Sequence, residues 1–282
     1  MKIRLSYLAL MIMAVMAFTG CTNGEKSASE LVESARVKMG EVTSLQAKMD
    51  MNVKMKLSEE EVTTVTTADI TAFVKPLKMK LDVSSSMMNG GPQDTVMQMY
   101  VKEDENGVTS YANTGTGWFN SKIERDSLGQ YHVYENIVQY LTTIEEPVDK
   151  GTEKIGDIPT VQVEGILKGD AMEKIVIESG ILTSAQSVGI SEEELKDMYA
   201  QVGGLPITLW ISQDGLVYQY KMDMTKLMQM VMDKTMELIG VNQLDTDMNI
   251  QVEDASIGMK CDSFNEVDPF EIPEDVLLVG QE

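Results

Sequence analysis

Residues 45–57 read LQAKMDMNVKMKL, and this stretch decides the fold of the chain. Every odd position from Ala47 to Leu57 is apolar, and every even position from Lys48 to Lys56 is polar or charged. A period of two places successive side chains on opposite faces of a β-strand. The stretch therefore predicts a half-buried strand with its methionines toward the interior and its charged side chains toward solvent.

Further strands are expected along the rest of the chain, separated by turns. Alternating or β-branched runs predict strands at residues 62–74, 77–83, 95–101, 108–112, 160–167, 206–211, 216–224 and 248–261, with a loop at 84–94. The pairs Asn106-Gly107 and Asp214-Gly215 predict hairpin turns, so neighbouring strands run antiparallel. We expect residues 45–119 and 160–261 to form the two halves of one curved sheet. A shift in the apolar phase predicts a bulge near Glu253-Asp254.

Helical periodicity marks the remaining segments. It predicts helices at residues 29–39, 131–144, 170–178, 191–202 and 226–239. Ser29 is the expected N-cap of the first helix, and Ser191 with Glu194 forms a capping-box pattern. Pro147 is expected to stop the helix of residues 131–144. No Gly-rich or Pro-rich linker divides the chain, so residues 30–282 are expected to form one domain. Its predicted class is α+β, a curved antiparallel β-sheet, or half-barrel, with helices covering the concave face.

The first residues have the pattern of a secretory signal. Lys2 and Arg4 precede a fourteen-residue run, 5–18, that is apolar except for Ser6. Such a run is shorter than the roughly 20 residues of a membrane-spanning helix. It fits the basic n-region and apolar h-region of a signal peptide.

The tetrapeptide Phe18-Thr19-Gly20-Cys21 resembles the lipobox of bacterial lipoproteins, with Phe18 in place of the usual Leu. The resemblance implies cleavage before Cys21 and a diacylglycerol thioether on its sulfur. Residues 1–20 are then a lipoprotein signal peptide, and residues 21–29 are the lipidated cysteine and a polar tether. The expected location is the outer, extracytoplasmic face of the cell membrane. The alternative is an ordinary signal peptide followed by a chance cysteine.

Composition narrows the functional classes. The 282 residues include 23 Lys and Arg against 45 Asp and Glu, a net charge of −22. Such a chain repels the phosphates of nucleic acid, so no nucleic-acid partner is expected. Apolar residues make up 43% of the chain and charged residues 24%, enough for a packed core. The unusual number is 23 methionines.

The methionines recur at alternate positions, which share one face of a strand. Thioethers bind Cu(I), but the polar residues between these methionines favour a core or an adaptable pocket wall over a copper site. We therefore predict an apolar pocket between the sheet and the helix of residues 226–239, with Trp210 at its rim or wall. The candidate ligand-binding residues are Met49, Met51, Met79, Met97, Met99, Trp210, Met222, Leu227, Met230 and Val231.

Catalytic and metal-binding motifs are missing from the sequence. His132 is the single histidine, and Asp245-x-Asp247-x-Asn249 has Ile250 where a calcium loop requires glycine. The chain contains no nucleophile elbow, phosphate loop or Cys-x-x-Cys. Cys261 lies on the apolar side of an alternating strand and is expected to be buried. We expect no catalytic residues, no enzyme activity, no metal and no cofactor.

Three segments resemble known half-barrel lipoproteins. Residues 205–224, LPITLWISQDGLVYQYKMDM, look like the Trp-bearing hairpin of LolA-like and LppX/LprG-like proteins. Residues 75–83, KPLKMKLDV, and 264–276, FNEVDPFEIPEDV, resemble segments of Firmicute lipoproteins with that architecture. The resemblance implies a LolA-like half-barrel, and in better-known relatives this space accepts acyl chains or lipid-linked molecules.

Two functions follow as expectations. The first is a lipid-anchored lipoprotein that binds or carries a lipid or other apolar ligand in a Met-rich concave pocket. The second is a structural or interaction lipoprotein of the cell envelope with a filled core and an unidentified protein partner. A cavity of roughly 300 Å³ or more favours the first, and a filled interior favours the second.

Overall fold

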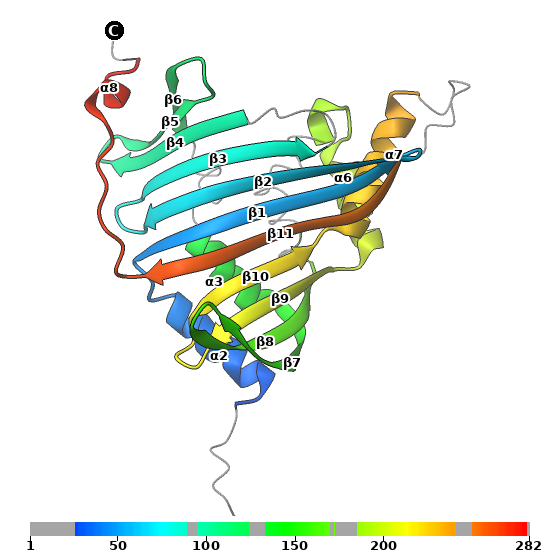
Figure 1. Ribbon diagram of the computed structural model, residues 1–282, viewed down its shortest axis with the longest axis horizontal. Coiled ribbons are helices and arrows are strands. Elements are labelled where there is room, and N and C mark those ends of the chain that lie inside the picture. Colours follow the sequence, from blue (N-terminus) through cyan, green and yellow to red (C-terminus); the bar gives the residue numbers. More distant parts are fainter. Residues whose placement is uncertain are drawn as a thin grey trace, which may run out of the picture.

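The computed structural model describes residues 26–88, 95–123, 133–169, 172, 185–240 and 250–280. Its strands form one antiparallel sheet of eleven strands, drawn in Figure 1. The strands are β1 (Ser44–Leu57), β2 (Glu60–Phe73), β3 (Lys78–Met88), β4 (Thr95–Asp104), β5 (Gly107–Asn113), β6 (Trp118–Ile123), β7 (Ile144–Ile155), β8 (Ile158–Leu167), β9 (Leu205–Ser212), β10 (Val217–Asp223) and β11 (Ile250–Phe264). Their order in the sheet is β6-β5-β4-β3-β2-β1-β11-β10-β9-β8-β7.

The first and last strands of the chain pair at the centre of this sheet and join its two halves. Met49 of β1 lies opposite Met259 of β11 on one side and Ala68 of β2 on the other. The register shifts where Lys54 and Met55 face β11, because Glu253 has no partner there, and this confirms the predicted bulge. The extra residue increases the local twist and helps the sheet to curve.

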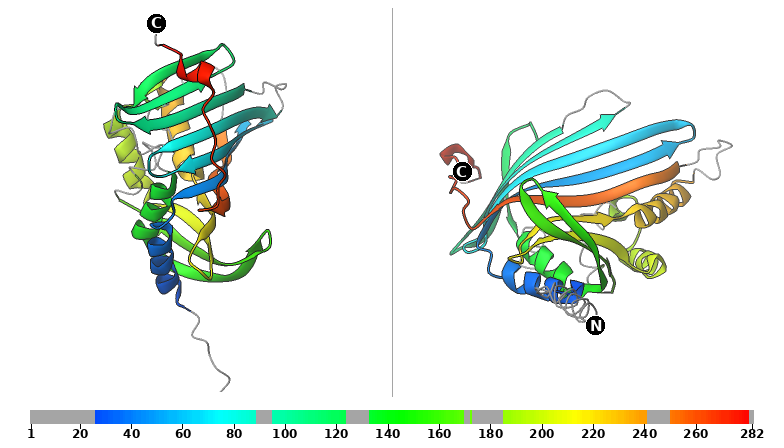
Figure 2. Two further views of the ribbon diagram at one scale, coloured as in Figure 1. Left: turned by 90° about the vertical axis from the view of Figure 1, so that its left-hand side faces the viewer. Right: turned by 60° about the horizontal axis from the view of Figure 1, so that its bottom comes forward.

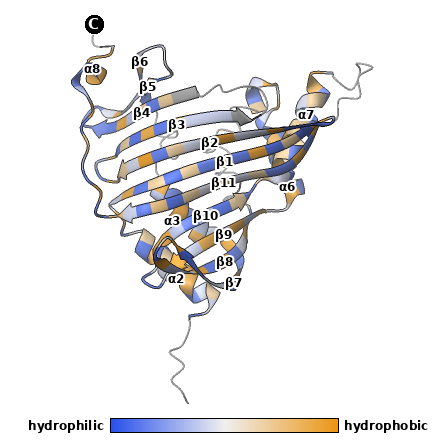
Figure 3. Cartoon of the chain, viewed as in Figure 1, coloured by the Kyte–Doolittle hydropathy of each residue, from blue (hydrophilic) through white to orange (hydrophobic). Residues whose placement is uncertain are grey.

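The faces of β1 follow the predicted alternation, which also appears as alternating colours along the strands in Figure 3. Met49, Met51, Val53 and Met55 pack against the main hydrophobic core. On the opposite face, Lys48 pairs with Asp69 at 2.6 Å. The methionines are only half-buried, because the space above them is not filled, as described below.

The helices are α2 (Ala28–Met39), α3 (Val133–Thr143), α6 (Glu192–Val202), α7 (Thr225–Leu238) and α8 (Glu274–Leu277). Helices α2 and α3 contact each other, as do α6 and α7, and α7 also crosses β11. Figure 2 shows these four helices on the face around which the sheet curves. Within the described residues, no helix is both long and apolar enough to cross a membrane.

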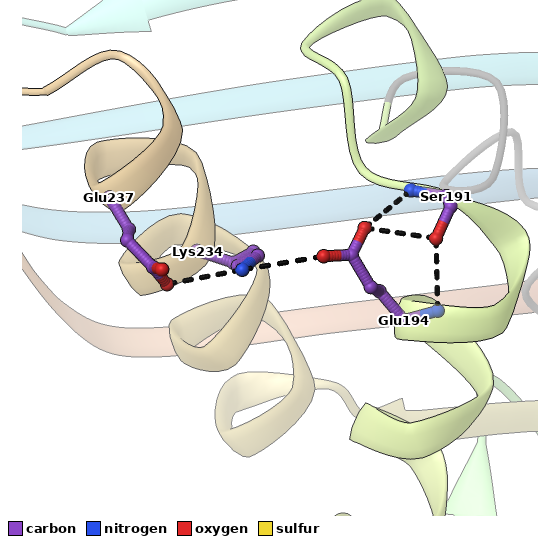
Figure 4. Close-up of polar contacts among 4 residues, drawn as sticks. All are labelled: Ser191, Glu194, Lys234 and Glu237. Atoms are coloured by element: carbon purple, nitrogen blue, oxygen red, sulfur yellow. Dashed lines mark hydrogen bonds and ion pairs between the residues drawn. The ribbon is translucent and has the colours of Figure 1, made fainter.

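Two capping boxes fix helix starts. The α2 cap is Ser27, two residues before the predicted Ser29, since only Ser27 has a glutamate, Glu30, three residues later. The predicted Ser191–Glu194 box is confirmed at α6. Figure 4 shows that the other oxygen of Glu194 meets Lys234 of α7, whose Nζ lies 3.3 Å away. The same carboxylate therefore caps α6 and ties it to α7.

Two predicted boundaries are wrong, and one segment falls outside the described residues. Pro147 does not end a helix: α3 stops at Thr143, and Pro147 lies inside β7. An edge strand accepts proline because one side of its backbone needs no partner. Strand β3 continues through Ser84–Ser86, predicted as loop, because β2 pairs with them. Of the helix predicted at 170–178, only Met172 is described, and it is buried.

The C-terminal segment covers the outer face of β3 to β6. It leaves β11, passes the ends of the central strands and reaches α8 beside β5 and β6 (Figure 1). Ile272 and Val276 form a second buried cluster with Tyr111. Tyr100 contacts both Trp118 and Phe270, with ring centroids 5.5 and 6.1 Å apart. This cluster covers part of the outer face of the sheet's first half, and the site lies on the opposite face.

Candidate functional site

A cavity of about 460 Å³ lies between the concave face of the sheet and helix α3. Strands β1 to β4, β10 and β11 form its wall, and α3 covers it. The lining residues are Met49, Met51, Thr66, Thr67, Ala68, Ile70, Met79, Leu81, Val83, Met97, Met99, Val133, Asn136, Tyr140, Tyr220, Met222 and Ile257. Its volume falls in the range of about 300–1,000 Å³ that small-molecule sites occupy.

The register of the strands brings six of the predicted methionines together: Met49, Met51, Met79, Met97, Met99 and Met222. Met51 lies opposite Ile257, which in turn lies opposite Met222. Directly opposite residues of antiparallel strands share a face, so three strands contribute neighbouring side chains to one wall. Unbranched thioether side chains adapt to guests of different shape. The wall is therefore apolar and deformable.

Helix α3 closes the cavity with Val133, Asn136 and Tyr140, which lie on one face at i, i+3 and i+7. Tyr140 meets Tyr220 of β10 edge to face, with ring centroids 5.4 Å apart. Burial raises the pKa of Tyr220, so its hydroxyl stays protonated. Asn136 Oδ1 is buried and accepts no hydrogen bond from the described residues. The helical periodicity of residues 131–144 predicts that one side of α3 is buried. It does not indicate that this side covers the cavity.

The polar side chains of the wall are uncharged. Thr66 and Ser85 form a hydrogen bond between their hydroxyl oxygens at 3.0 Å, which satisfies part of the hydrogen-bonding capacity of Thr66. None of the described residues that line the cavity is Asp, Glu, Lys or Arg. A buried ion is unfavourable unless it is paired, so the cavity suits an uncharged apolar group.

The prediction that Trp210 lines the pocket is wrong. Trp210 lies opposite Gln162 and Gln219, which places it on the face opposite to Leu209. There the indole Nε1 donates a hydrogen bond to Glu153 Oε2 of β7 at 2.7 Å. Strand β7 thus buries Trp210 on the outer side of the sheet.

The prediction that the pocket lies between the sheet and α7 is also wrong. Leu227 is fully buried in the core, whereas Met230 and Val231 are half-buried and pack against it. None of these three lines the large cavity. A small pocket beside α7, lined in part by Met224 and Met228, measures about 10 Å³. Because α7 packs closely on β11, the open volume lies under α3.

A larger hollow of about 540 Å³ on the outer face is a different kind of feature. It is lined by charged side chains that include Lys150, Glu164 and Lys221. Lys150 and Glu164 already pair with each other at 2.9 Å. Apolar residues such as Val148, Ile166 and Pro206 also line this groove, but it is open and carries charged side chains, so it lacks the enclosure and the uncharged wall of the cavity under α3.

The described residues contain no cluster of three or more His, Cys, Asp or Glu placed to hold a metal ion. His132, Asp245 and Asn249 lie outside the described residues, as does Cys21. Cys261 is buried, as predicted, and burial raises its pKa to about 12. At neutral pH this thiol is protonated and is no nucleophile.

Comparisons with known proteins support the fold. Residues 27–141, less than half of the chain, match a family of unknown function, DUF6612. LprF of Mycobacterium bovis has a similar structure, with a TM-score of 0.51 and 13% identity over 88% of this chain and 96% of LprF. The lipoprotein LppX of Mycobacterium tuberculosis gives a TM-score of 0.49 and 14% identity over 86% of this chain and 98% of LppX. No curated protein matches the sequence.

The shared feature of these structures is the architecture. The chain has the predicted half-barrel, an open curved antiparallel sheet with helices, and its fold is similar to that of LprF. At 13% identity the likeness concerns the fold alone.

Proposed function

We propose that the chain is a lipid-anchored protein of the outer face of the cell membrane that binds an apolar ligand non-covalently. The observation that carries this proposal is the cavity of about 460 Å³ under α3. Its volume exceeds the roughly 300 Å³ at which ligand sites begin, and its wall combines flexible thioethers with aliphatic side chains.

Binding would follow from the hydrophobic effect. An apolar guest that displaces water from such a wall gains roughly 25 cal/mol for each Å² of apolar surface removed from water. Methionines from β1, β3, β4 and β10 can change rotamer to fit different chains. The step needs no catalytic group, so the proposed role is that of a binding or carrier protein and not of an enzyme.

Anchoring is proposed at Cys21, on the evidence of the lipobox-like residues 18–21. A diacylglycerol thioether supplies two acyl chains, which anchor firmly where one chain binds only marginally. The variant Cys21→Ala should release the protein into the medium or leave an unprocessed precursor in the membrane. Retention and processing like those of the wild type would contradict the anchor.

Ligand binding is tested with a soluble form that starts at Thr22. Diphenylhexatriene, an uncharged hydrocarbon probe, becomes fluorescent when it enters an apolar site. We expect saturable binding, and we expect Met99→Trp to weaken it at least tenfold because the indole fills part of the cavity. Met99 is half-buried in an open part of the wall, so the larger side chain should be tolerated.

The matched control is Gln98→Trp, the same change at the neighbouring position of β4. Gln98 is exposed and its side chain donates a hydrogen bond to Asp82, on the outer face. Unchanged binding in this variant, with weakened binding in Met99→Trp, would support the cavity. Absence of saturable binding, together with no lipid in native mass spectra of the detergent-extracted protein, would favour an envelope scaffold with no ligand.

A further inference from the structure

The hydroxyl-bearing side chains of the described cavity lining are accounted for within the protein. Thr66 shares a hydrogen bond with Ser85. The hydroxyls of Tyr140 and Tyr220 bond to each other, in addition to their ring contact. Thr67 is the next residue of β2 after Thr66 and is exposed, so its side chain lies on the outer face. None of these groups therefore requires a ligand.

The side chain of Asn136 is different. It lines the cavity from α3, between Val133 and Tyr140 on the same face of the helix. Its Oδ1 atom is buried and receives no hydrogen bond from the described residues. A buried acceptor without a donor is unfavourable, and native proteins retain few such groups. A polar group of this kind on the wall of an apolar cavity indicates a function in binding.

The surroundings of Asn136 select the kind of donor that can meet it. The described lining contains no Asp, Glu, Lys or Arg, so an ammonium group would enter without a counter-ion, which is unfavourable. A hydroxyl group is uncharged and donates one hydrogen bond. Wall atoms cover Oδ1, but the amide of Asn turns easily about its terminal torsion. Such a turn brings the oxygen toward a guest.

We propose that Asn136 determines the specificity of the cavity, because its side-chain oxygen accepts a hydrogen bond from an uncharged hydroxyl group of the ligand. This inference rests on the proposed function and narrows it to apolar molecules with a neutral hydroxyl, such as long-chain alcohols and partial acylglycerols. The hydroxyl lies beside α3, and the hydrocarbon part lies against the methionines of the sheet. A single polar contact in an apolar pocket fixes the orientation of the ligand.

The test compares two isomers that differ in one hydrogen-bond donor. Decanol carries a hydroxyl, whereas methyl nonyl ether has the same formula and an oxygen that only accepts hydrogen bonds. Both compete with diphenylhexatriene for the soluble form that starts at Thr22, and the readout is the ratio of their two dissociation constants. In Asn136→Leu, which has a side chain of similar size, the preference for decanol over the ether should fall about fivefold, the effect of one hydrogen bond.

The matched control is Gln139→Leu, which removes an amide from the same helix. Gln139 is half-buried and is not among the residues that line the cavity, so the preference for decanol should stay as in the wild type. An unchanged preference in Asn136→Leu would overturn the inference, and so would an equal fall in Gln139→Leu. Both results leave the proposed function standing as long as the wild type binds the probe saturably. Loss of that binding would remove both proposals.

The stability of the protein without ligand gives a second readout. Because Asn136→Leu replaces an unpaired buried acceptor by an apolar group, we expect the midpoint of thermal unfolding to stay the same or to rise. A lower midpoint would show that the amide has a partner within the protein, and it would overturn the inference.

Discussion

Tyr140 of α3 and Tyr220 of β10 meet edge to face, 5.4 Å between ring centroids, and fix the helix over the concave sheet. Tyr220 is 5% exposed, as is Tyr140, and both line the cavity. The pair therefore has two roles, since it joins helix to sheet and forms part of the pocket wall. Edge-to-face pairs add roughly 0.5–1.5 kcal/mol beyond their buried area.

The first prediction concerns this pair. Tyr140→Ala removes a buried ring and enlarges the cavity, and we expect it to lower the free energy of unfolding by roughly 3–5 kcal/mol. Tyr220→Phe keeps the ring and removes only a hydroxyl, so we expect it to lower the free energy of unfolding by about 1 kcal/mol. Urea denaturation of both variants measures the difference. Equal stability of Tyr140→Ala and wild type would mean that α3 does not pack on β10.

The second prediction tests the faces of β1. Met51→Asp places an unpaired charge against the apolar cavity wall, and we expect a loss of roughly 2–4 kcal/mol. Gln46→Asp, in the same strand, introduces the same charge at an exposed position and should stay within about 0.5 kcal/mol of wild type. Thermal unfolding of the two variants compares them. Equal transition temperatures would contradict the assignment of the faces.

Strand alternation predicted the sheet well because it reports directly which side chains are buried. The period of two predicted that the alternating methionines of β1, β3, β4 and β10 point to the interior, and six of these methionines line the cavity under α3. The pairing of β1 with β11 joins residues about 200 positions apart in sequence. The sequence predicted two halves of one sheet but not which strands join them. Strand β7 was missed, since most of its side chains are exposed and give no alternation.

The helix that covers the cavity could not be chosen from the sequence. Both α3 and α7 have an apolar stripe, so periodicity does not decide which one packs closely. Packing decides it: α7 follows β10 directly, and Thr225 at its start bonds to the backbone of Ala255. This short connection holds α7 against β11 and leaves the space under α3. The face on which Trp210 lies could not be predicted either. Trp210 is buried, but it is β7, on the outer face of the sheet, that buries it.

The third prediction concerns the α6 cap. In Ser191→Ala the helix loses its side-chain cap, and we expect a loss of about 1 kcal/mol in the free energy of unfolding. The Glu194 carboxylate accepts hydrogen bonds from the backbone N–H and hydroxyl of Ser191 and also pairs with Lys234, and these contacts lower its pKa below the ordinary 4.5. Denaturant unfolding of Ser191→Ala measures the cap, and an unchanged midpoint would contradict its role.

The pH dependence of the same carboxylate follows from the direction of that shift. Since the folded pKa is the lower one, the contribution of Glu194 is fully present above pH 4.5 and is lost as pH falls through the folded pKa. Glu194→Gln should therefore lose less stability than wild type between pH 5 and pH 3. The group is exposed, so salt should reduce the difference. A parallel decline of both proteins would show that the contacts do not persist in solution.

The last prediction is that Cys261 does not react in the folded protein. In the soluble form that starts at Thr22, Cys261 is the single cysteine. Burial, with a smaller effect of the Asp262 carboxylate, raises its pKa from 9.0 to about 12. A thiol-specific disulfide reagent at pH 8 needs both access and a thiolate, so labelling should occur only at the rate of unfolding and go to completion in concentrated guanidinium chloride.

The raised pKa of Cys261 has a second consequence. Between pH 9 and pH 12 the unfolded thiol ionises and the folded one does not, so stability falls with rising pH in that window. Cys261→Ala should flatten this alkaline decline. Rapid labelling of the native protein, faster than unfolding, would show that β11 opens locally beside β1 and that the centre of the sheet is not closed.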